Sequence, residues 1–155
     1  MVLIDLNIWL YAYNTSEKQQ QAAQSWIESV LISGESVIVP WSVIVGFARL
    51  IGLGPLRFNL EVLDQTLSNF FSALSQDNVT VINPSQNFLE VYQKIVITCQ
   101  SYGNLAPDAY LAALAIENGA RLATNDKGFS RFESEGLRWF NPLVQEHLRK
   151  KSKKR

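Results

Sequence analysis

Three aspartates of this 155-residue chain stand at positions from which a folded sheet could bring their carboxylates together. Asp5 follows the apolar run 1–4, and Asp126 follows the short run 121–123. Asp108 opens an alanine-rich segment. Taken singly, each has a simple structural explanation, because Asp5 and Asp126 can cap the helices that follow and Asp108 can favour a helix dipole.

Three carboxylates gathered in one place call for a cation among them, since like charges repel and raise one another's pKa. The donor set is all oxygen, and the chain has no cluster of His or Cys residues. Such donors favour a hard ion, Mg²⁺ or Mn²⁺, which binds through one or two carboxylates together with waters and a substrate phosphate. The chemistry indicated is hydrolysis of a phosphodiester, with either one ion or two.

The charge distribution and the cysteine content indicate where in the cell this chemistry would take place and which metal sites are excluded. The 14 basic and 14 acidic residues give a net charge of zero, but six of the basic residues lie in 149–155. The body of the chain, 1–148, therefore has 8 basic and 14 acidic groups and a net charge of −6. The single cysteine, Cys99, excludes a disulfide within the chain and a multi-cysteine zinc site, and it favours a reducing compartment.

The start of the chain has an Asp at its fifth residue and no basic, cleavable leader. The longest apolar runs are broken well before the roughly 20 residues that a membrane-spanning helix needs. With 47% hydrophobic and 18% charged residues, the chain can fill one sizeable core. We expect a soluble, cytoplasmic protein of one domain with no membrane partner.

Short apolar runs alternate along the chain with longer segments of helical periodicity. The expected strands are brief and mostly β-branched, whereas the expected helices have apolar residues three and four positions apart. Strands are expected at 1–4, 36–39, 79–82, 121–123 and 137–140. Helices are expected at 6–13, 22–34, 41–51, 60–74, 85–102 and 107–118, with one helical turn at 129–132. Ser16 and Gln19 have the spacing of a capping box before the second helix.

This alternation predicts an α/β fold with a central, mainly parallel twisted sheet flanked by helices, because crossover helices connect parallel neighbours. In such sheets ligands bind beyond the carboxyl ends of the strands. Asp5 and Asp126 both follow strands, so they are expected at that edge. Asp108 is expected to join them from the start of a helix.

The three aspartates belong to recognisable motifs. These are Asp5-Leu-Asn7 after an apolar strand, Pro107-Asp108-Ala-Tyr-Leu-Ala-Ala-Leu-Ala115, and Leu122-Ala-Thr-Asn-Asp-Lys-Gly-Phe129. Together they resemble the PIN-domain ribonucleases and, in size and layout, the VapC toxins of bacterial toxin–antitoxin pairs. The resemblance covers essentially 1–145, and the last two motifs make it fairly specific.

This resemblance implies a single PIN domain, which we place at 1–148. The basic tail at 149–155 has no apolar residues, so we expect it to be disordered. The resemblance implies an endoribonuclease whose Mg²⁺ or Mn²⁺ is held by Asp5, Asp108 and Asp126. It also implies an RNA substrate, a cognate antitoxin protein that occupies the active site, and a homodimer.

Other positions match the family in supporting roles. Thr124 stands two positions before Asp126, where the family has a Thr or Ser that helps to hold the site. Asn7 and Asn125 are expected to give polar support. Arg49, on the helix that faces the expected site, could bind a phosphate or an antitoxin carboxylate, or could form a surface salt bridge instead.

One stretch departs from the family, which commonly has a Glu on the helix after the second strand. Here the corresponding stretch, 41–50, has no acidic residue. A site with fewer carboxylates should bind an ion more weakly and depend more on the phosphate of the substrate. Glu61 or Asp64 on the next helix is a candidate replacement.

Two other functions stay open at this point. A PIN-like module that binds RNA or protein without turnover is favoured by the missing Glu and by the zero net charge. A phosphotransfer or haloacid-dehalogenase-like domain would use Asp5 as its nucleophile, but the second Asp expected two positions later is Asn7.

Several aromatic or reactive residues are expected to be structural. Core packing is favoured over base stacking for Trp9 and Trp41, and Cys99 lies on the apolar stripe of its helix. His147 has no partner at a ligand-like spacing. The tail at 149–155 would either attract RNA phosphates in a salt-dependent way or only increase solubility.

Overall fold

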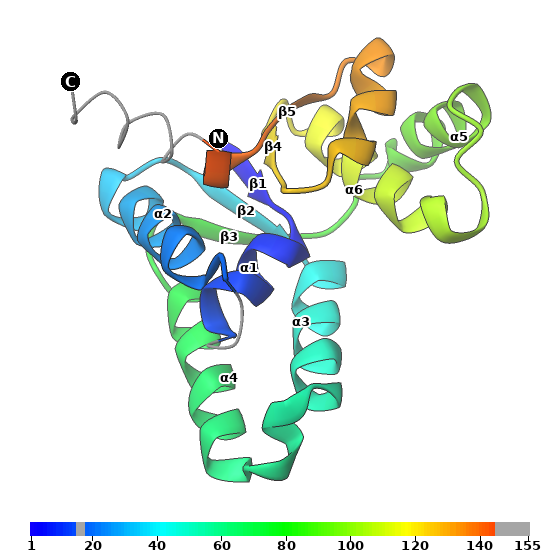
Figure 1. Ribbon diagram of the computed structural model, residues 1–155. Coiled ribbons are helices and arrows are strands. Elements are labelled where there is room, and N and C mark those ends of the chain that lie inside the picture. The colour runs from blue at the N-terminus through cyan, green and yellow to red at the C-terminus, as the bar shows by residue number, and fades with distance from the viewer. Residues whose placement is uncertain (15–17, 145–155) are drawn as a thin grey trace, which may run out of the picture.

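The computed structural model describes residues 1–14 and 18–144, in which five strands form one sheet with helices around it (Figure 1). In chain order the elements are β1 (Val2–Ile4), α1 (Leu6–Tyr13), α2 (Gln20–Ser33), β2 (Val37–Pro40), α3 (Trp41–Leu53), η1 (Pro55–Phe58), α4 (Leu60–Leu74), β3 (Val79–Ile82), α5 (Phe88–Thr98), η2 (Gly103–Leu105), α6 (Ala106–Glu117), β4 (Arg121–Ala123), η3 (Lys127–Glu135) and β5 (Arg138–Phe140). Within the described ranges no helix combines the length and apolar character that a bilayer-spanning segment requires.

The strands lie in the order β3-β2-β1-β4-β5, and every neighbouring pair is parallel. Val2 pairs with Val37 on one side and with Arg121 on the other, so β1 is the central strand. Every residue of β1 and β2 is buried, as is typical of parallel strands covered on both faces. The expected α/β fold with a parallel sheet flanked by helices is confirmed.

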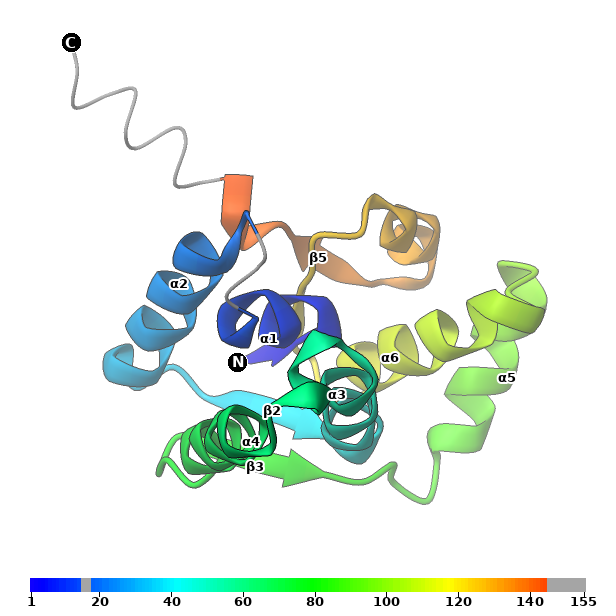
Figure 2. The same ribbon diagram turned by 60° about the horizontal axis from the view of Figure 1, so that its bottom comes forward.

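The helices cover the sheet and extend beyond it. Helix α1 packs against α2 and α3, and α5 packs against α6. Figure 2 shows α2 and the α5–α6 pair at opposite ends of the molecule, as does the first view. Helices α3 and α4 project together from the sheet and are joined at their far end by η1 (Figure 1).

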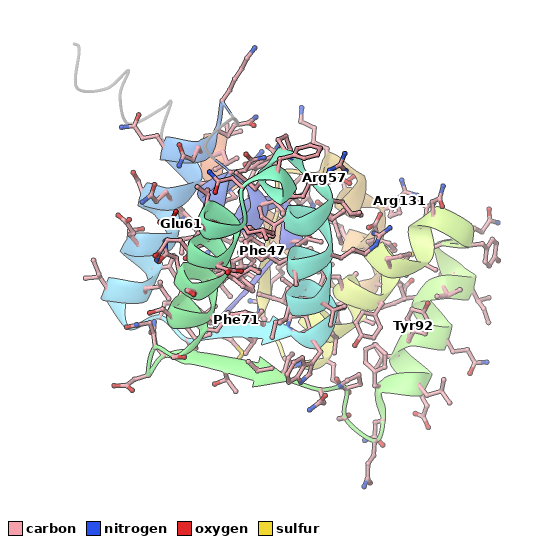
Figure 3. The ribbon with its side chains drawn as sticks, turned by 90° about the horizontal axis from the view of Figure 1, so that it is seen from below. Phe47, Arg57, Glu61, Phe71, Tyr92 and Arg131 are labelled. Carbon is pink, nitrogen blue, oxygen red and sulfur yellow. The ribbon has the colours of Figure 1, made fainter. Side chains whose placement is uncertain are left out.

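An aromatic cluster holds the projecting α3–α4 pair to α1. The rings of Phe47 and Phe70 are stacked with their centroids 4.0 Å apart, and Trp9 meets Phe70 edge-on at 5.3 Å. All three side chains are fully buried, and Figure 3 shows Phe47 between the two projecting helices. Gly46 allows the close approach of α3 to α1, since a Cβ there would lie 2.7 Å from Cδ2 of Leu6.

Two helical segments differ in length from the prediction. The helix expected at 85–102 is the shorter α5, because turns border it on both sides. Before α5 the hydroxyl of Ser85 accepts a hydrogen bond from the N–H of Asn87 (3.1 Å), and after it Gln100 adopts a left-handed conformation (φ 49°). The single turn expected at 129–132 is part of the longer 3₁₀ helix η3.

The two tryptophans near strand ends differ in burial. Trp9 is in the core, as expected. The expectation for Trp41 is wrong, because its side chain is 53% exposed. Trp41 opens α3 on the same face as the exposed Val45, whereas the buried face of that helix is the one with Phe47.

Some sequence predictions fall outside the described residues. These are Ser16 of the expected capping box, His147 and the basic tail at 149–155. The domain boundary at 148 therefore stays a prediction. Gln19, which precedes α2, makes no capping hydrogen bond through its side chain.

Candidate active site

Asp5 and Thr124 lie side by side at the carboxyl edge of the sheet, because each directly follows a paired strand. The N–H of Asp5 donates to the carbonyl of Ala123 (3.0 Å), which extends the pairing of β1 with β4. The N–H of Thr124 donates to the carbonyl of Phe140 (3.0 Å), which extends the pairing of β4 with β5. The sheet ladder therefore sets the positions of both side chains, of which Asp5 is 8% and Thr124 0% exposed.

The Thr124 hydroxyl is the centre of the hydrogen bonds at this edge. It donates to Oδ2 of Asp5 at 2.6 Å. It accepts from Nδ2 of Asn7 at 3.1 Å and from the N–H of Asp126 at 3.0 Å. A hydroxyl has one hydrogen to donate and two lone pairs, so all of its capacity is used.

A second set of polar side chains surrounds the residues that bond to the Thr124 hydroxyl. The N–H of Asn125 donates to Oδ1 of Asn7 (3.4 Å), and Nδ2 of Asn125 donates to the hydroxyl of Tyr11 (3.5 Å). Asn141 donates from Nδ2 to Oδ1 of Asn125 (2.6 Å), and it accepts from the N–H of Leu143 (2.9 Å). The loop after β4 is thereby tied both to α1 and to the segment after β5.

The aspartates differ in whether they also serve as helix caps. Oδ1 of Asp126 accepts from the N–H of Gly128 (2.7 Å), so the expected capping role is confirmed for this residue. Asp5 occupies the N-cap position of α1, but its side chain makes no capping hydrogen bond. Asp108 lies in the first turn of α6, where a negative charge interacts favourably with the helix dipole.

The carboxylates influence one another's protonation. Burial, the largest cause, and the neighbouring charges of Asp108 and Asp126 raise the pKa of Asp5, whereas hydrogen bonds from the Thr124 hydroxyl and from the Leu6 amide lower it. The net result is a pKa of about 6. The three acids that the sequence singled out therefore lie within electrostatic reach of one another.

Asp108 has one cationic neighbour. Burial and then the charge of Asp126 raise the pKa of the Asp108 carboxyl, while the guanidinium of Arg131 lowers it. Arg131 is held in place by a hydrogen bond from its Nε to the carbonyl of Gly128 (2.9 Å). This bond leaves the terminal nitrogens of Arg131 for other contacts.

The donor chemistry fits a divalent cation at an open site. Within residues 1–14 and 18–144, no three His, Cys, Asp or Glu side chains form a group that could hold a metal ion by themselves. The acids do supply oxygen donors whose mutual repulsion a cation would relieve. Mg²⁺ commonly binds through one or two carboxylates and completes its shell with waters and substrate phosphate. These residues therefore fit a metal site in which the protein supplies some of the ligands and the substrate phosphate supplies another.

We refer to Asp5, Asp108 and Asp126 together as the acidic group. No side chain of α3 or α4 belongs to it. Helix α3 has no acidic residue, and the exposed Arg49 makes no ion pair within the described part of the chain. The carboxylates that act on Asp5 are Asp108 and Asp126, not those of α4. Figure 3 shows Glu61 and Arg131 on opposite sides of α3. The structure gives no support to replacement of the missing Glu from α4.

Sequence reasoning missed three residues around the site, which are Tyr11, Arg131 and Asn141. Tyr11 could have been found, since it lies one helical turn after Asn7 on α1. Nothing in the sequence distinguishes Asn141 or Arg131 from surface residues, because their roles depend on the β4–β5 pairing and on the path of η3.

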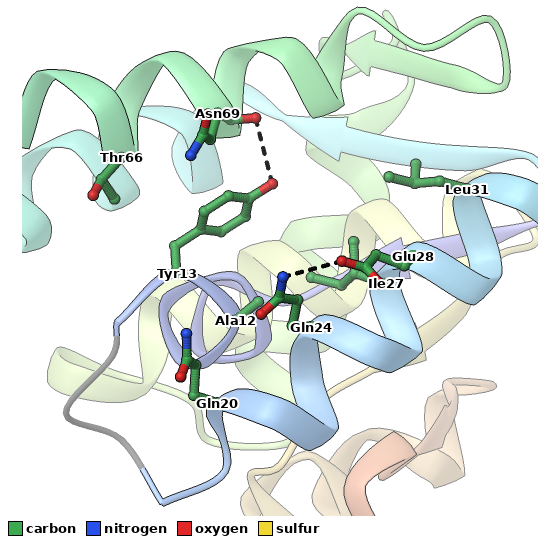
Figure 4. Close-up of a pocket in the computed structure, with 9 residues that line it drawn as sticks. All are labelled: Ala12, Tyr13, Gln20, Gln24, Ile27, Glu28, Leu31, Thr66 and Asn69. Carbon is green, nitrogen blue, oxygen red and sulfur yellow. Dashed lines mark hydrogen bonds between the residues drawn. The ribbon is translucent and has the colours of Figure 1, made fainter. Parts of the chain in front are cut away.

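A pocket of about 240 Å³ with a mixed polar and apolar lining lies apart from these acids, between α1, α2 and α4 (Figure 4). Across it the hydroxyl of Tyr13 on α1 donates to the carbonyl of Asn69 on α4 (3.4 Å). Along α2, Nε2 of Gln24 donates to Glu28 (3.0 Å). Burial and the nearby charge of Glu28 raise the pKa of Tyr13. None of the residues that line this pocket belongs to the hydrogen-bonded group around Thr124.

Comparison with known proteins agrees with this fold. The model of the PIN domain matches residues 2–135. Ribonuclease VapC37 of Mycobacterium tuberculosis (strain H37Rv) is 30% identical over 145 residues, which are 92% of this chain and 97% of the relative. The VapC ribonuclease Mb2897 of Mycobacterium bovis is 26% identical over 149 residues, 96% of this chain and 100% of the relative. The chain belongs to the PIN-domain family and groups with its VapC ribonucleases.

Solved structures share the fold at lower identity. VapBC2 from Rickettsia felis, bound to a DNA fragment from its promoter, has a TM-score of 0.68 at 20% identity and covers 91% of this chain and 98% of its own. VapC20 of Mycobacterium tuberculosis, a toxin that cleaves the Sarcin-Ricin loop, has a TM-score of 0.61 at 15% identity, with 88% and 96% covered. Both likenesses extend over nearly the whole chain.

Proposed function

We propose that this chain is the toxin of a toxin–antitoxin pair and an endoribonuclease that depends on Mg²⁺ or Mn²⁺. Membership in the PIN-domain family and relatives named as VapC ribonucleases support the proposal. The observation that carries it is the contact of the Thr124 hydroxyl with both Asp5 and the backbone of Asp126. One buried side chain thereby joins two of the three acids.

In this proposal Asp5, Asp108 and Asp126 are the catalytic, metal-binding acids. A bound Mg²⁺ or Mn²⁺ supplies Lewis acidity toward a phosphate oxygen and lowers the pKa of the attacking water. Thr124 orients the Asp5 carboxylate, and Asn7 holds Thr124. In the hydrolysis the water oxygen bonds to phosphorus, the bond from phosphorus to the leaving ribose oxygen breaks, and that oxygen takes up a proton.

The proposal extends to the partners of the chain. RNA is the substrate, a cognate antitoxin covers the acidic group, and two copies of the chain form a homodimer in the cytoplasm. Arg49 is proposed to bind phosphate or an antitoxin carboxylate, and Asn125 to support Asn7. Among the solved structures with this fold, VapBC2 of Rickettsia felis and VapBC-1 of Haemophilus influenzae have names that pair VapB with VapC.

The toxin role can be tested by inducing the chain without an antitoxin in a bacterial host. Expression of the wild-type chain should arrest growth and produce new RNA ends. The Asp108→Asn variant, which keeps the size of the side chain and removes its charge, should do neither at equal protein level. Asp64→Asn on α4 is the matched control and should behave as the wild type, because Asp64 is exposed and outside the acidic group. Growth arrest by Asp108→Asn as strong as by wild type would contradict the proposal.

A PIN-like module that binds without turnover is the second candidate. The observation that favours it is the absence of any acidic residue on α3. Metal-dependent RNA ends produced by the purified wild-type chain and lost in Asp5→Ala would exclude it.

A further inference from the structure

A second pocket shares a side chain with the hydrogen-bonded group around Thr124. It has a volume of about 250 Å³ and is formed by α1, the end of α3 and the start of η1. Asn7 is the shared side chain, since it lines this pocket and also donates to the Thr124 hydroxyl. A strand of RNA with a phosphate at the acids would therefore have a neighbouring nucleotide at the mouth of the pocket.

The lining of the pocket combines apolar and polar side chains. Leu50, Ile51 and Leu56 supply apolar surface, and Ile51 is nearly fully buried. Asn7 and Tyr11 lie on one face of α1, four positions apart, and both line the pocket. This is the composition of a site for a planar ligand with a polar edge.

The polar groups keep hydrogen-bonding capacity for such a ligand. The Asn7 amide has two N–H hydrogens and two lone pairs on its oxygen, of which one donor bonds Thr124 and one lone pair accepts from Asn125. The Tyr11 hydroxyl accepts from Asn125, and among the residues that the structure describes no acceptor takes its hydrogen. Two lining residues of the pocket therefore retain hydrogen-bonding capacity.

We propose that this pocket binds one unstacked nucleobase next to the scissile phosphate and so sets the base preference of the nuclease. The inference rests on the proposed function, which supplies RNA as the substrate. Single-stranded RNA is read through bases that stack on aromatic side chains and hydrogen-bond along their edges. The pocket is smaller than the roughly 300–1,000 Å³ typical of sites for drug-sized ligands, which favours one base over a peptide segment.

Leu50 and Leu53 on α3 provide a matched pair for the test. Leu50 lines the pocket and is 38% exposed, so Leu50→Trp should fill the pocket without disturbing the core. Leu53 is 56% exposed and does not line the pocket, so Leu53→Trp adds the same ring elsewhere on the helix. Tyr11→Phe is a second probe that removes only a hydroxyl.

The experiment measures binding of five-nucleotide homopolymers of each base by fluorescence anisotropy, in the Asp108→Asn background so that no RNA is cut. Each RNA is compared with versions that lack the base at one position in turn. For the parent and Leu53→Trp, loss of one particular base should weaken binding roughly tenfold, the scale of one base–aromatic contact. Leu50→Trp should reduce that effect to less than about twofold, and Tyr11→Phe should change which base binds best.

Equal sensitivity of Leu50→Trp and Leu53→Trp to the missing base would overturn the pocket assignment, and so would no sensitivity in the parent. A pocket that serves a protein segment would give the first of these results. Because the assay records binding alone, it is independent of whether the wild-type chain cuts RNA. Thermal unfolding of each variant verifies that it is folded.

Discussion

The hydroxyl of Thr124 lies 2.6 Å from Oδ2 of Asp5, although 119 positions separate the two residues in the chain. The parallel pairing of β1 with β4 brings them together, and the contact is fully buried. Because the same hydroxyl also accepts from Asn7 and from the backbone of Asp126, its removal affects three groups at once.

Replacement of Thr124 by valine should destabilise the fold. Valine keeps the shape but removes the hydroxyl that donates to the buried Asp5 carboxylate, and an unsatisfied buried polar group costs about 1–3 kcal/mol. Thr124→Ser keeps the hydroxyl and should lose less. Urea denaturation in EDTA measures the free energy of unfolding of both variants, and an equal loss in the two would contradict the role given to the hydroxyl.

The stability of the metal-free protein should depend on pH through Asp5. Its carboxyl pKa is about 6 in the folded chain against 3.8 for the ordinary group, so the folded state keeps a proton that the unfolded state loses. The free energy of unfolding should therefore fall by about 3 kcal/mol in all as the pH rises from about 3 to about 7, and this contribution should then level off.

Asp5→Asn is the control for this pH dependence. An amide does not titrate, so the variant should lack the Asp5 contribution and should gain stability relative to wild type across the same interval. Denaturation curves at half-unit pH steps in EDTA provide the comparison. A wild-type chain that gains stability relative to Asp5→Asn over this interval would show that the Asp5 pKa is not raised.

Divalent cations should stabilise the wild-type chain more than Asp108→Asn. A ligand that binds only the folded state at 100 times its dissociation constant adds about 2.7 kcal/mol to the free energy of unfolding. Thermal unfolding with Mn²⁺ and with EDTA gives the shift for each protein. Asp64→Asn should respond as the wild type does, whereas equal shifts in wild type and Asp108→Asn would place the ion elsewhere.

The aromatic cluster should dominate the attachment of the α3–α4 pair. Phe70 is fully buried between Phe47 and Trp9, so Phe70→Ala should cost about 3–5 kcal/mol. The adjacent Phe71 is 46% exposed, and Phe71→Ala should cost clearly less. Urea denaturation measures the free energy of unfolding of the two variants. Similar losses of this free energy would mean that the cluster is not the main attachment.

Much of the fold could be predicted from the sequence, because β-branched runs and helical stripes have distinct periods. The strands at 79–82 and 121–123 agree with the structure residue by residue. The ends of α5 were missed, since they depend on a turn at Ser85 and a left-handed Gln100 that periodicity does not reveal.

The candidate site was predictable in part for a similar reason. The positions of Asp5 and Asp126 follow from the strands before them. The contact of Asn141 with Asn125 follows from the register of β4 with β5, which a single sequence does not disclose. The exposure of Trp41 depends on which face of α3 meets the core.

The measurement that tests the central claim most directly is cleavage of a structured RNA pool by purified protein, with Mg²⁺, Mn²⁺ or EDTA, scored by mapping the new ends. The wild type should produce metal-dependent ends. Asp5→Asn, Asp108→Asn and Asp126→Asn should each lose them, while Asp64→Asn keeps them. Cleavage that persists in EDTA, or that survives in any of the three site variants at the wild-type rate, would contradict a metal-dependent nuclease site built from these acids.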